Sequence, residues 1–128
     1  RGIEVYDDFA HHPTAIETTL DGARKRLGER KLWAIIEPRS NTMRMGSHKD
    51  GLAHSARLAD EVIWYQPEGL DWDLQPVISA SANKAEVSRS LDDIIARVVN
   101  EAGEGDAVVI MSNGGFGGLH QKLITALS

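Results

Sequence analysis

Cysteine is absent from this chain of 128 residues, proline occurs four times, and the aromatic residues are three tryptophans, two tyrosines and two phenylalanines. The lack of cysteine excludes a disulfide framework and a thiolate metal centre, and it is typical of proteins in a reducing compartment. No apolar run approaches the ~20 residues that cross a bilayer, and no stretch resembles a signal peptide. We therefore expect a cytoplasmic protein that has no membrane partner.

Positive charge is also scarce, because 14 lysines and arginines stand against 19 aspartates and glutamates and leave a net charge of −5. General nucleic-acid binders need a clustered basic surface to neutralise phosphates, so we expect no nucleic-acid partner. The one basic cluster, at residues 24–31, coincides with the predicted end of a helix. Positive charge there complements the negative end of the helix dipole, and we interpret the cluster in this way.

A phosphate-binding loop for ATP is missing as well. The pattern Gly-x-x-x-x-Gly-Lys-Ser/Thr does not occur, and the glycine-rich stretch at residues 114–118 lacks the lysine and hydroxyl that such a loop uses. An ATP-dependent reaction is therefore not complete in this chain. The length suits one domain, and the chain begins at Arg1, without an initiator methionine, almost directly on a predicted strand. We interpret it as a fragment of a longer protein.

Apolar segments that suit strands alternate with segments of helical periodicity along the whole chain. Strands are predicted at 3–6, 32–36, 62–65, 77–78 and 107–111, and helices at 13–27, 52–59, 91–102 and 119–127. Ser90 with Asp93 resembles a pair that caps the third helix. The last helix is expected to face the core with Leu119, Leu123, Ile124 and Leu127. The alternation predicts an α/β fold of three layers, with a mostly parallel sheet and helices on both faces.

The loops after three of these strands carry the polar side chains of most interest, and the carboxyl ends of parallel strands meet at one edge of a sheet. The first loop carries Asp7, Asp8, His11 and His12 before a helix, whose N-terminus attracts a nucleotide or a carboxylate. Alternatively, either aspartate caps the turn. Adjacent histidines point in different directions and no further ligand set accompanies them, so we expect no metal site.

The other two loops suit an anionic ligand. The second places Arg39 and Arg44 around a polar Ser-Asn-Thr stretch. Guanidinium groups bind planar carboxylates through two parallel hydrogen bonds, and a solvated arginine pair is the alternative. The third loop, at residues 112–118, is rich in glycine, which permits close backbone approach to an anion. A glycine-rich turn is a weak signal by itself.

Three stretches of the sequence resemble one family. They read Asp-Asp-Phe-Ala-His-His-Pro-Thr at 7–14, Glu-Pro-Arg-Ser-Asn-Thr-Met-Arg-Met-Gly at 37–46 and Met-Ser-Asn-Gly-Gly-Phe-Gly-Gly-Leu-His-Gln-Lys-Leu at 111–123. The first resembles the start of the C-terminal domain of the ATP-dependent muramyl ligases. The other two resemble the branch of that family that attaches the recycled tripeptide L-Ala-γ-D-Glu-meso-diaminopimelate to UDP-N-acetylmuramate in peptidoglycan recycling. The resemblance extends over nearly all of the chain.

The resemblance implies a Rossmann-like C-terminal domain at residues 1–128 that binds the amino substrate of a ligase. The UDP-sugar-binding domain and the central ATPase domain are then absent from this chain, and the central domain holds most of the ATP and Mg²⁺. ATP would phosphorylate the muramate carboxylate, and the tripeptide amine would attack the acyl phosphate. The chain alone is expected to be inactive and to supply no catalytic nucleophile. Two alternatives are the C-terminal domain of a UDP-N-acetylmuramate–L-alanine ligase and a stand-alone flavodoxin-like binding module.

The resemblance also implies two groups of site residues. The residues expected to bind ATP are Asp8, His11 and His12. The residues expected to bind the tripeptide are Arg39, Ser40, Asn41, Thr42, Arg44, Ser112, Asn113, Gly114, Gly115 and Phe116. For Phe116, a lid over the core is the structural alternative.

Overall fold

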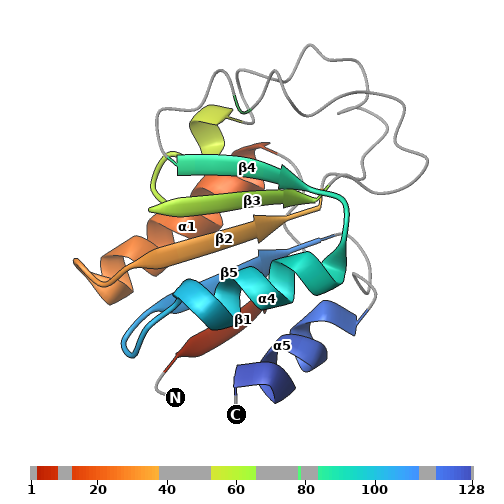
Figure 1. Ribbon diagram of the computed structural model, residues 1–128. Coiled ribbons are helices and arrows are strands. Elements are labelled where there is room, and N and C mark those ends of the chain that lie inside the picture. Colours follow the sequence, from red (N-terminus) through yellow and green to blue (C-terminus); the bar gives the residue numbers. More distant parts are fainter. Residues whose placement is uncertain are drawn as a thin grey trace.

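The computed structural model describes residues 3–8, 13–37, 53–65, 78, 84–112 and 118–127. Within these ranges the strands are β1 (Glu4–Asp8), β2 (Leu32–Ile36), β3 (Glu61–Tyr65), β4 (Lys84–Ser88) and β5 (Ala107–Met111). They form one five-stranded sheet in the order β1-β5-β2-β3-β4, and every pairing in it is parallel (Figure 1). The prediction of a mostly parallel sheet is confirmed.

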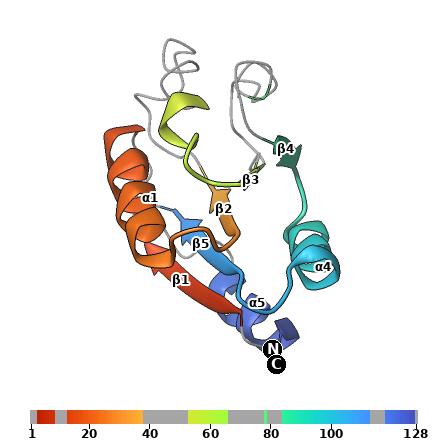
Figure 2. The ribbon, with the colours of Figure 1, turned by 90° about the vertical axis from the view of Figure 1, so that its left-hand side faces the viewer.

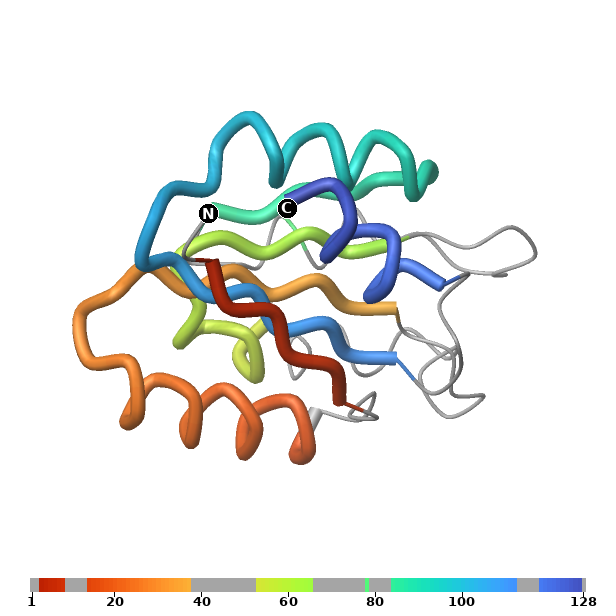
Figure 3. Tube along the Cα trace, turned by 90° about the horizontal axis from the view of Figure 1, so that it is seen from below, coloured from red at the N-terminus to blue at the C-terminus, as the bar shows by residue number. Residues whose placement is uncertain are grey.

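Helices cover both faces of this sheet. Helix α1 (Pro13–Leu27) and a short helical segment at residues 53–55 lie on one face, and α4 (Leu91–Glu101) and α5 (Leu119–Leu127) lie on the other (Figure 2). Figure 3 shows the same layers from below, with α1 on one side of the strands and α4 and α5 on the opposite side. The three-layer α/β fold predicted from the sequence is therefore confirmed.

Each face of the sheet has its own hydrophobic core, because successive strand residues point to opposite sides. In β2, Leu32, Ala34 and Ile36 pack with α1, whereas Trp33 and Ile35 pack with α4 and α5. Both β2 and β5 are buried along their whole length. This burial explains why both strands read as uninterrupted apolar runs in the sequence.

Polar side chains define the helix ends as the sequence predicts. Arg24, in the last turn of α1, donates hydrogen bonds to the carbonyl oxygens of Leu58 at 2.7 Å and Gly28 at 3.1 Å. This residue of the basic cluster therefore binds the carbonyl group of Gly28, which directly follows the helix, and also ties the helix end to Leu58. Ser90 is the N-cap of α4, and its hydroxyl oxygen accepts the Asp93 N–H at 3.3 Å. The predicted capping pair is confirmed.

The predicted strand at residues 77–78 is wrong at Ile78, and Val77 lies outside the described residues. Ile78 is helical, and the fourth strand is β4, at Lys84–Ser88. Among the described strands β4 pairs with β3 alone, so it is an edge strand. Only Ala85 and Val87 of this strand pack against the core on the α1 side. A strand that buries so few apolar side chains gives a weak signal in the sequence.

The core-facing side of α5 also differs from the prediction at one position. Leu119, Leu123 and Leu127 are buried, but Ile124 is 37% exposed. The three leucines follow one another at intervals of four residues and form a single stripe along the helix. Ile124 lies about 100° around the helix from Leu123, which turns it away from that stripe.

Candidate functional site

The carboxyl ends of three adjacent strands bring polar residues together. β1 ends at Asp8, β2 is followed directly by Glu37, and β5 is followed directly by Ser112. The backbone N–H of Ser112 donates to the carbonyl oxygen of Asp8 at 3.1 Å, and the N–H of Glu37 donates to that of Met111 at 2.9 Å. The structure thus places Asp8 and Ser112, one from each predicted group of site residues, beside each other.

The remaining predicted site residues lie outside the described part of the chain, and their roles stay predictions. They are His11, His12, Arg39, Ser40, Asn41, Thr42, Arg44, Asn113, Gly114, Gly115 and Phe116.

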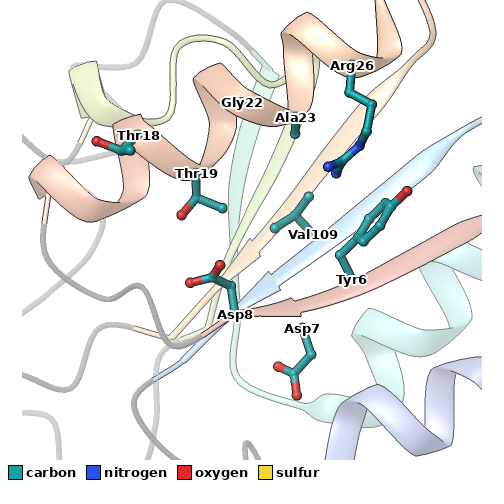
Figure 4. Close-up of a pocket in the computed structure, with 9 residues that line it drawn as sticks. All are labelled: Tyr6, Asp7, Asp8, Thr18, Thr19, Gly22, Ala23, Arg26 and Val109. Atoms are coloured by element: carbon teal, nitrogen blue, oxygen red, sulfur yellow. The ribbon is translucent and has the colours of Figure 1, made fainter.

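Asp8 lies at one end of a shallow hollow of about 370 Å³ between β1 and α1 (Figure 4). Its carboxylate extends toward α1, near Thr19, whereas Asp7 also lines the hollow but its carboxylate points away from α1 (Figure 4). Alternation along the strand separates the two acids in this way. Of this adjacent pair, Asp8 is the one directed toward the helix that follows the predicted ATP-binding loop.

The other end of the hollow carries an aromatic ring and a cation. The guanidinium carbon of Arg26 lies 4.7 Å from the centre of the Tyr6 ring. The Tyr6 hydroxyl donates to the Glu4 carboxylate, and this hydrogen bond raises the pKa of Tyr6 and lowers the pKa of Glu4. The hollow therefore offers a carboxylate acceptor at one end and a cation at the other, groups that suit a polar ligand with hydroxyl groups and negative charge.

A buried hydrogen bond joins the ends of β2 and β5. The Ser112 hydroxyl donates to Oε1 of Glu37 at 2.7 Å, and the two residues are 2% and 7% exposed. Sequence analysis places Ser112 in the candidate site but assigns no role to Glu37. The available signal is an acid that follows an entirely apolar strand and precedes Pro38, at the edge where ligands bind in parallel α/β sheets.

A second polar cluster lies at the opposite end of the strands, where they begin. Glu61, the first residue of β3, is 3% exposed and pairs with Lys31, with Lys84 at 3.5 Å and with Arg97 at 2.6 Å. Burial opposes ionisation of Glu61, but the hydrogen bond and charge of Lys31, with the charges of Lys84 and Arg97, hold its pKa below the ordinary value. Lys31 and Arg97 also lie over the ring of Trp33. We interpret this cluster as structural, because it lies at the amino ends of the strands and ligands of parallel α/β sheets bind at the carboxyl ends.

No group of three or more histidine, cysteine, aspartate or glutamate residues that could hold a metal ion occurs among the described residues. None of the described helices is long and apolar enough to cross a membrane.

A parallel α/β sheet with polar side chains at the carboxyl ends of its strands belongs to the class of domains that bind ligands at that edge. The family model of the Mur ligase, glutamate ligase domain, matches residues 1–114. The chain therefore belongs to the Mur ligase family, as its sequence motifs indicate.

Relatives of two activities align with the chain. It is 48% identical, over 99% of its length, to the UDP-N-acetylmuramate–L-alanyl-γ-D-glutamyl-meso-2,6-diaminoheptandioate ligase of Escherichia coli (strain K12). A murein peptide ligase from Psychrobacter arcticus 273-4 superimposes on 98% of the chain with a TM-score of 0.89 and 59% identity. The UDP-N-acetylmuramate–L-alanine ligase of Leuconostoc citreum (strain KM20) is 36% identical to the chain over 68% of its length. The aligned part is 19% of that ligase. The chain spans 28% of the length of each of the first two proteins.

Proposed function

We propose that this chain is the C-terminal, amino-substrate-binding domain of an ATP-dependent ligase that joins L-Ala-γ-D-Glu-meso-diaminopimelate to UDP-N-acetylmuramate. The observation that carries the proposal is the 48% identity to a ligase of that name over 99% of the chain. The L-alanine ligases that align in sequence over two thirds of the chain or more are only 30%, 34% and 36% identical to it, which disfavours the first alternative. A stand-alone binding module is disfavoured because these relatives are several times longer than the chain.

In the proposed reaction, the γ-phosphoryl group of ATP passes to the muramate carboxylate on the two domains that precede this one. The alanine amine of the tripeptide then attacks the carbonyl carbon, an amide bond forms and inorganic phosphate leaves. We place ATP and Mg²⁺ mainly on the central domain, as the resemblance to the muramyl ligases implies. This domain contributes by orienting the amine and by excluding water when it closes on the ATP site. We place the reaction in the cytoplasm, where ATP is available.

In this proposal, some residues at the carboxyl ends of the strands bind ATP and others bind the tripeptide. Asp8 would accept hydrogen bonds from the ATP ribose, with His11 and His12 nearby in the sequence, because a carboxylate pairs well with hydroxyl groups. Arg39 and Arg44 would bind carboxylates of the tripeptide. The polar stretch Ser40, Asn41 and Thr42 and the glycine-rich loop would line the remainder of the peptide site. Support comes from the position of Asp8 and Ser112 at one edge.

An ATP-dependent ligation assay on the full-length protein tests the proposal. ADP release is measured with UDP-N-acetylmuramate and either the tripeptide or L-alanine. We expect release that depends on the tripeptide and is much slower with L-alanine. Preference for L-alanine would identify the L-alanine ligase, and no release with either substrate would favour a binding module.

A further inference from the structure

The Glu37–Ser112 pair is almost completely buried. Burial of a carboxylate is costly unless hydrogen bonds compensate for lost hydration. Within the described ranges the Glu37 side chain makes one hydrogen bond, and its donor is the neutral hydroxyl of Ser112. Each partner depends on the other, because loss of either side chain leaves a buried polar group without this hydrogen bond.

The position of the pair shows what it holds together. The β2–β5 ladder ends at the register pair Ile36 and Met111, and Glu37 and Ser112 are the next residues on each strand. The hydrogen bond between their side chains therefore joins the two strands one residue beyond the last register pair. The Ser112 N–H also bonds to Asp8, which ties β1 to the same point.

This point is the base of both predicted peptide-binding loops, since Arg39 is two residues beyond Glu37 and Asn113 follows Ser112 directly. We propose that Glu37 and Ser112 form a positioning pair that holds the carboxyl ends of β2 and β5, from which the chain continues into the two predicted loops, so that the tripeptide amine is held for attack. The proposal rests on the proposed function. Glu37 is a positioning residue in it and acts through Ser112, without contact with the substrate.

Variants of the full-length ligase test the pair. Glu37→Ala and Ser112→Ala both remove the hydrogen bond, and we expect each to raise the KM for the tripeptide about tenfold, the effect of losing a bond to a charged group. The KM for ATP should change no more than about twofold, which is the effect that a substitution away from the ATP site usually has. The double variant should be no worse than either single variant, because both changes break one interaction.

Glu37→Gln is the rescue variant. Its amide oxygen can still accept the Ser112 hydroxyl, so we expect the KM for the tripeptide to stay within about threefold of the parent value, since a neutral acceptor weakens the bond only in part. If Glu37→Gln is as poor as Glu37→Ala while Ser112→Ala is nearly normal, the charge itself is required. That result would overturn the positioning role in favour of direct binding of a substrate amine.

Asp106→Ala is the matched control for lost stability. Asp106 accepts a hydrogen bond from the Trp33 indole at 3.2 Å and lies before β5, at the opposite edge of the sheet. We expect this variant to lower the thermal midpoint without raising the KM for the tripeptide. If the KM for the tripeptide rises equally in Asp106→Ala and Ser112→Ala, the cause is a general loosening of the domain, and the proposal is overturned. Failure of the proposed function is distinguishable, because the parent enzyme would then show no tripeptide-dependent ligation.

Discussion

Two neighbouring carboxylates on β1 provide a matched pair at the residue scale, because Asp8 extends toward α1 and Asp7 points away from α1. In the full-length ligase, we expect Asp8→Asn to raise the KM for ATP about tenfold, because the carboxylate can accept from both ribose hydroxyl groups and each of these bonds weakens when the acceptor becomes neutral. Asp7→Asn should stay within about twofold of the parent. The measurement is initial-rate kinetics with ATP varied at saturating tripeptide, beside thermal midpoints. A lower midpoint with unchanged KM would identify Asp8 as a turn cap.

Glu61 gives the domain a predictable dependence on pH. Its pKa in the folded state lies below the ordinary value of 4.5, so ionised Glu61 stabilises the fold above that pH. The contribution is lost as the pH falls through the folded-state pKa. We expect Glu61→Gln to lower the free energy of unfolding by about 2–3 kcal/mol at pH 7, because three cations lose a buried anionic partner. The difference from the parent should shrink below pH 4.5.

Urea unfolding of parent and variant at several pH values measures this difference. Glu104→Gln is the control, because Glu104 is exposed and lies just before the start of β5. Its free energy of unfolding should follow that of the parent at every pH. A gap between Glu61→Gln and the parent that stays constant down to pH 3 would contradict the role of ionised Glu61.

The sequence predicts only some residues of the candidate site. Asp8 and Ser112 are predictable because each follows or ends an apolar strand in a loop with other polar residues. The Glu37–Ser112 bond is not predictable in this way, since it joins positions 75 residues apart. A lone acid after a strand has many structural explanations, and its partner becomes visible only when the strand order is known.

At the scale of the element, α5 offers adjacent apolar residues in opposite environments. Leu123 is completely buried and Ile124 is 37% exposed. We expect Leu123→Ala to cost about 2–5 kcal/mol of stability, because it leaves a cavity against the sheet. Ile124→Ala should cost about 0.5 kcal/mol or less, as is typical of surface positions. Denaturant unfolding measures both, and equal losses would contradict the orientation of α5.

The strands differ in how well the sequence predicts them, and the difference follows from their place in the sheet. β2 and β5 lie in the middle, are covered on both faces and appear as continuous apolar runs. β4 lies at the edge and combines Lys84 and Glu86 with only two apolar residues that pack against the α1-side core. Its identity as a strand is set by pairing with β3, a contact between distant parts of the chain that local periodicity does not encode.

For the molecule as a whole, the two cores predict that residues 1–128 fold alone. Buried residues from α1, α4, α5 and the sheet form one core on each face. We expect a cooperative thermal transition for the isolated chain, but no ADP release with ATP, UDP-N-acetylmuramate and tripeptide, because the chain contains no phosphate-binding loop. Circular dichroism and a coupled ADP assay measure the two properties. Tripeptide-dependent ADP release by the isolated chain would contradict the assignment of catalysis to the other domains.

The strand order has a consequence for how the domain assembles. β5, the last strand in the sequence, lies between β1 and β2, the first two. During synthesis, β1 therefore has no partner among the described strands until residues 107–111 have emerged, whereas β2 can pair with β3 before that point. Asp8, Glu37 and Ser112 are connected only through β5, so we expect that the candidate site does not form in a partly folded chain in which β5 is not yet in place.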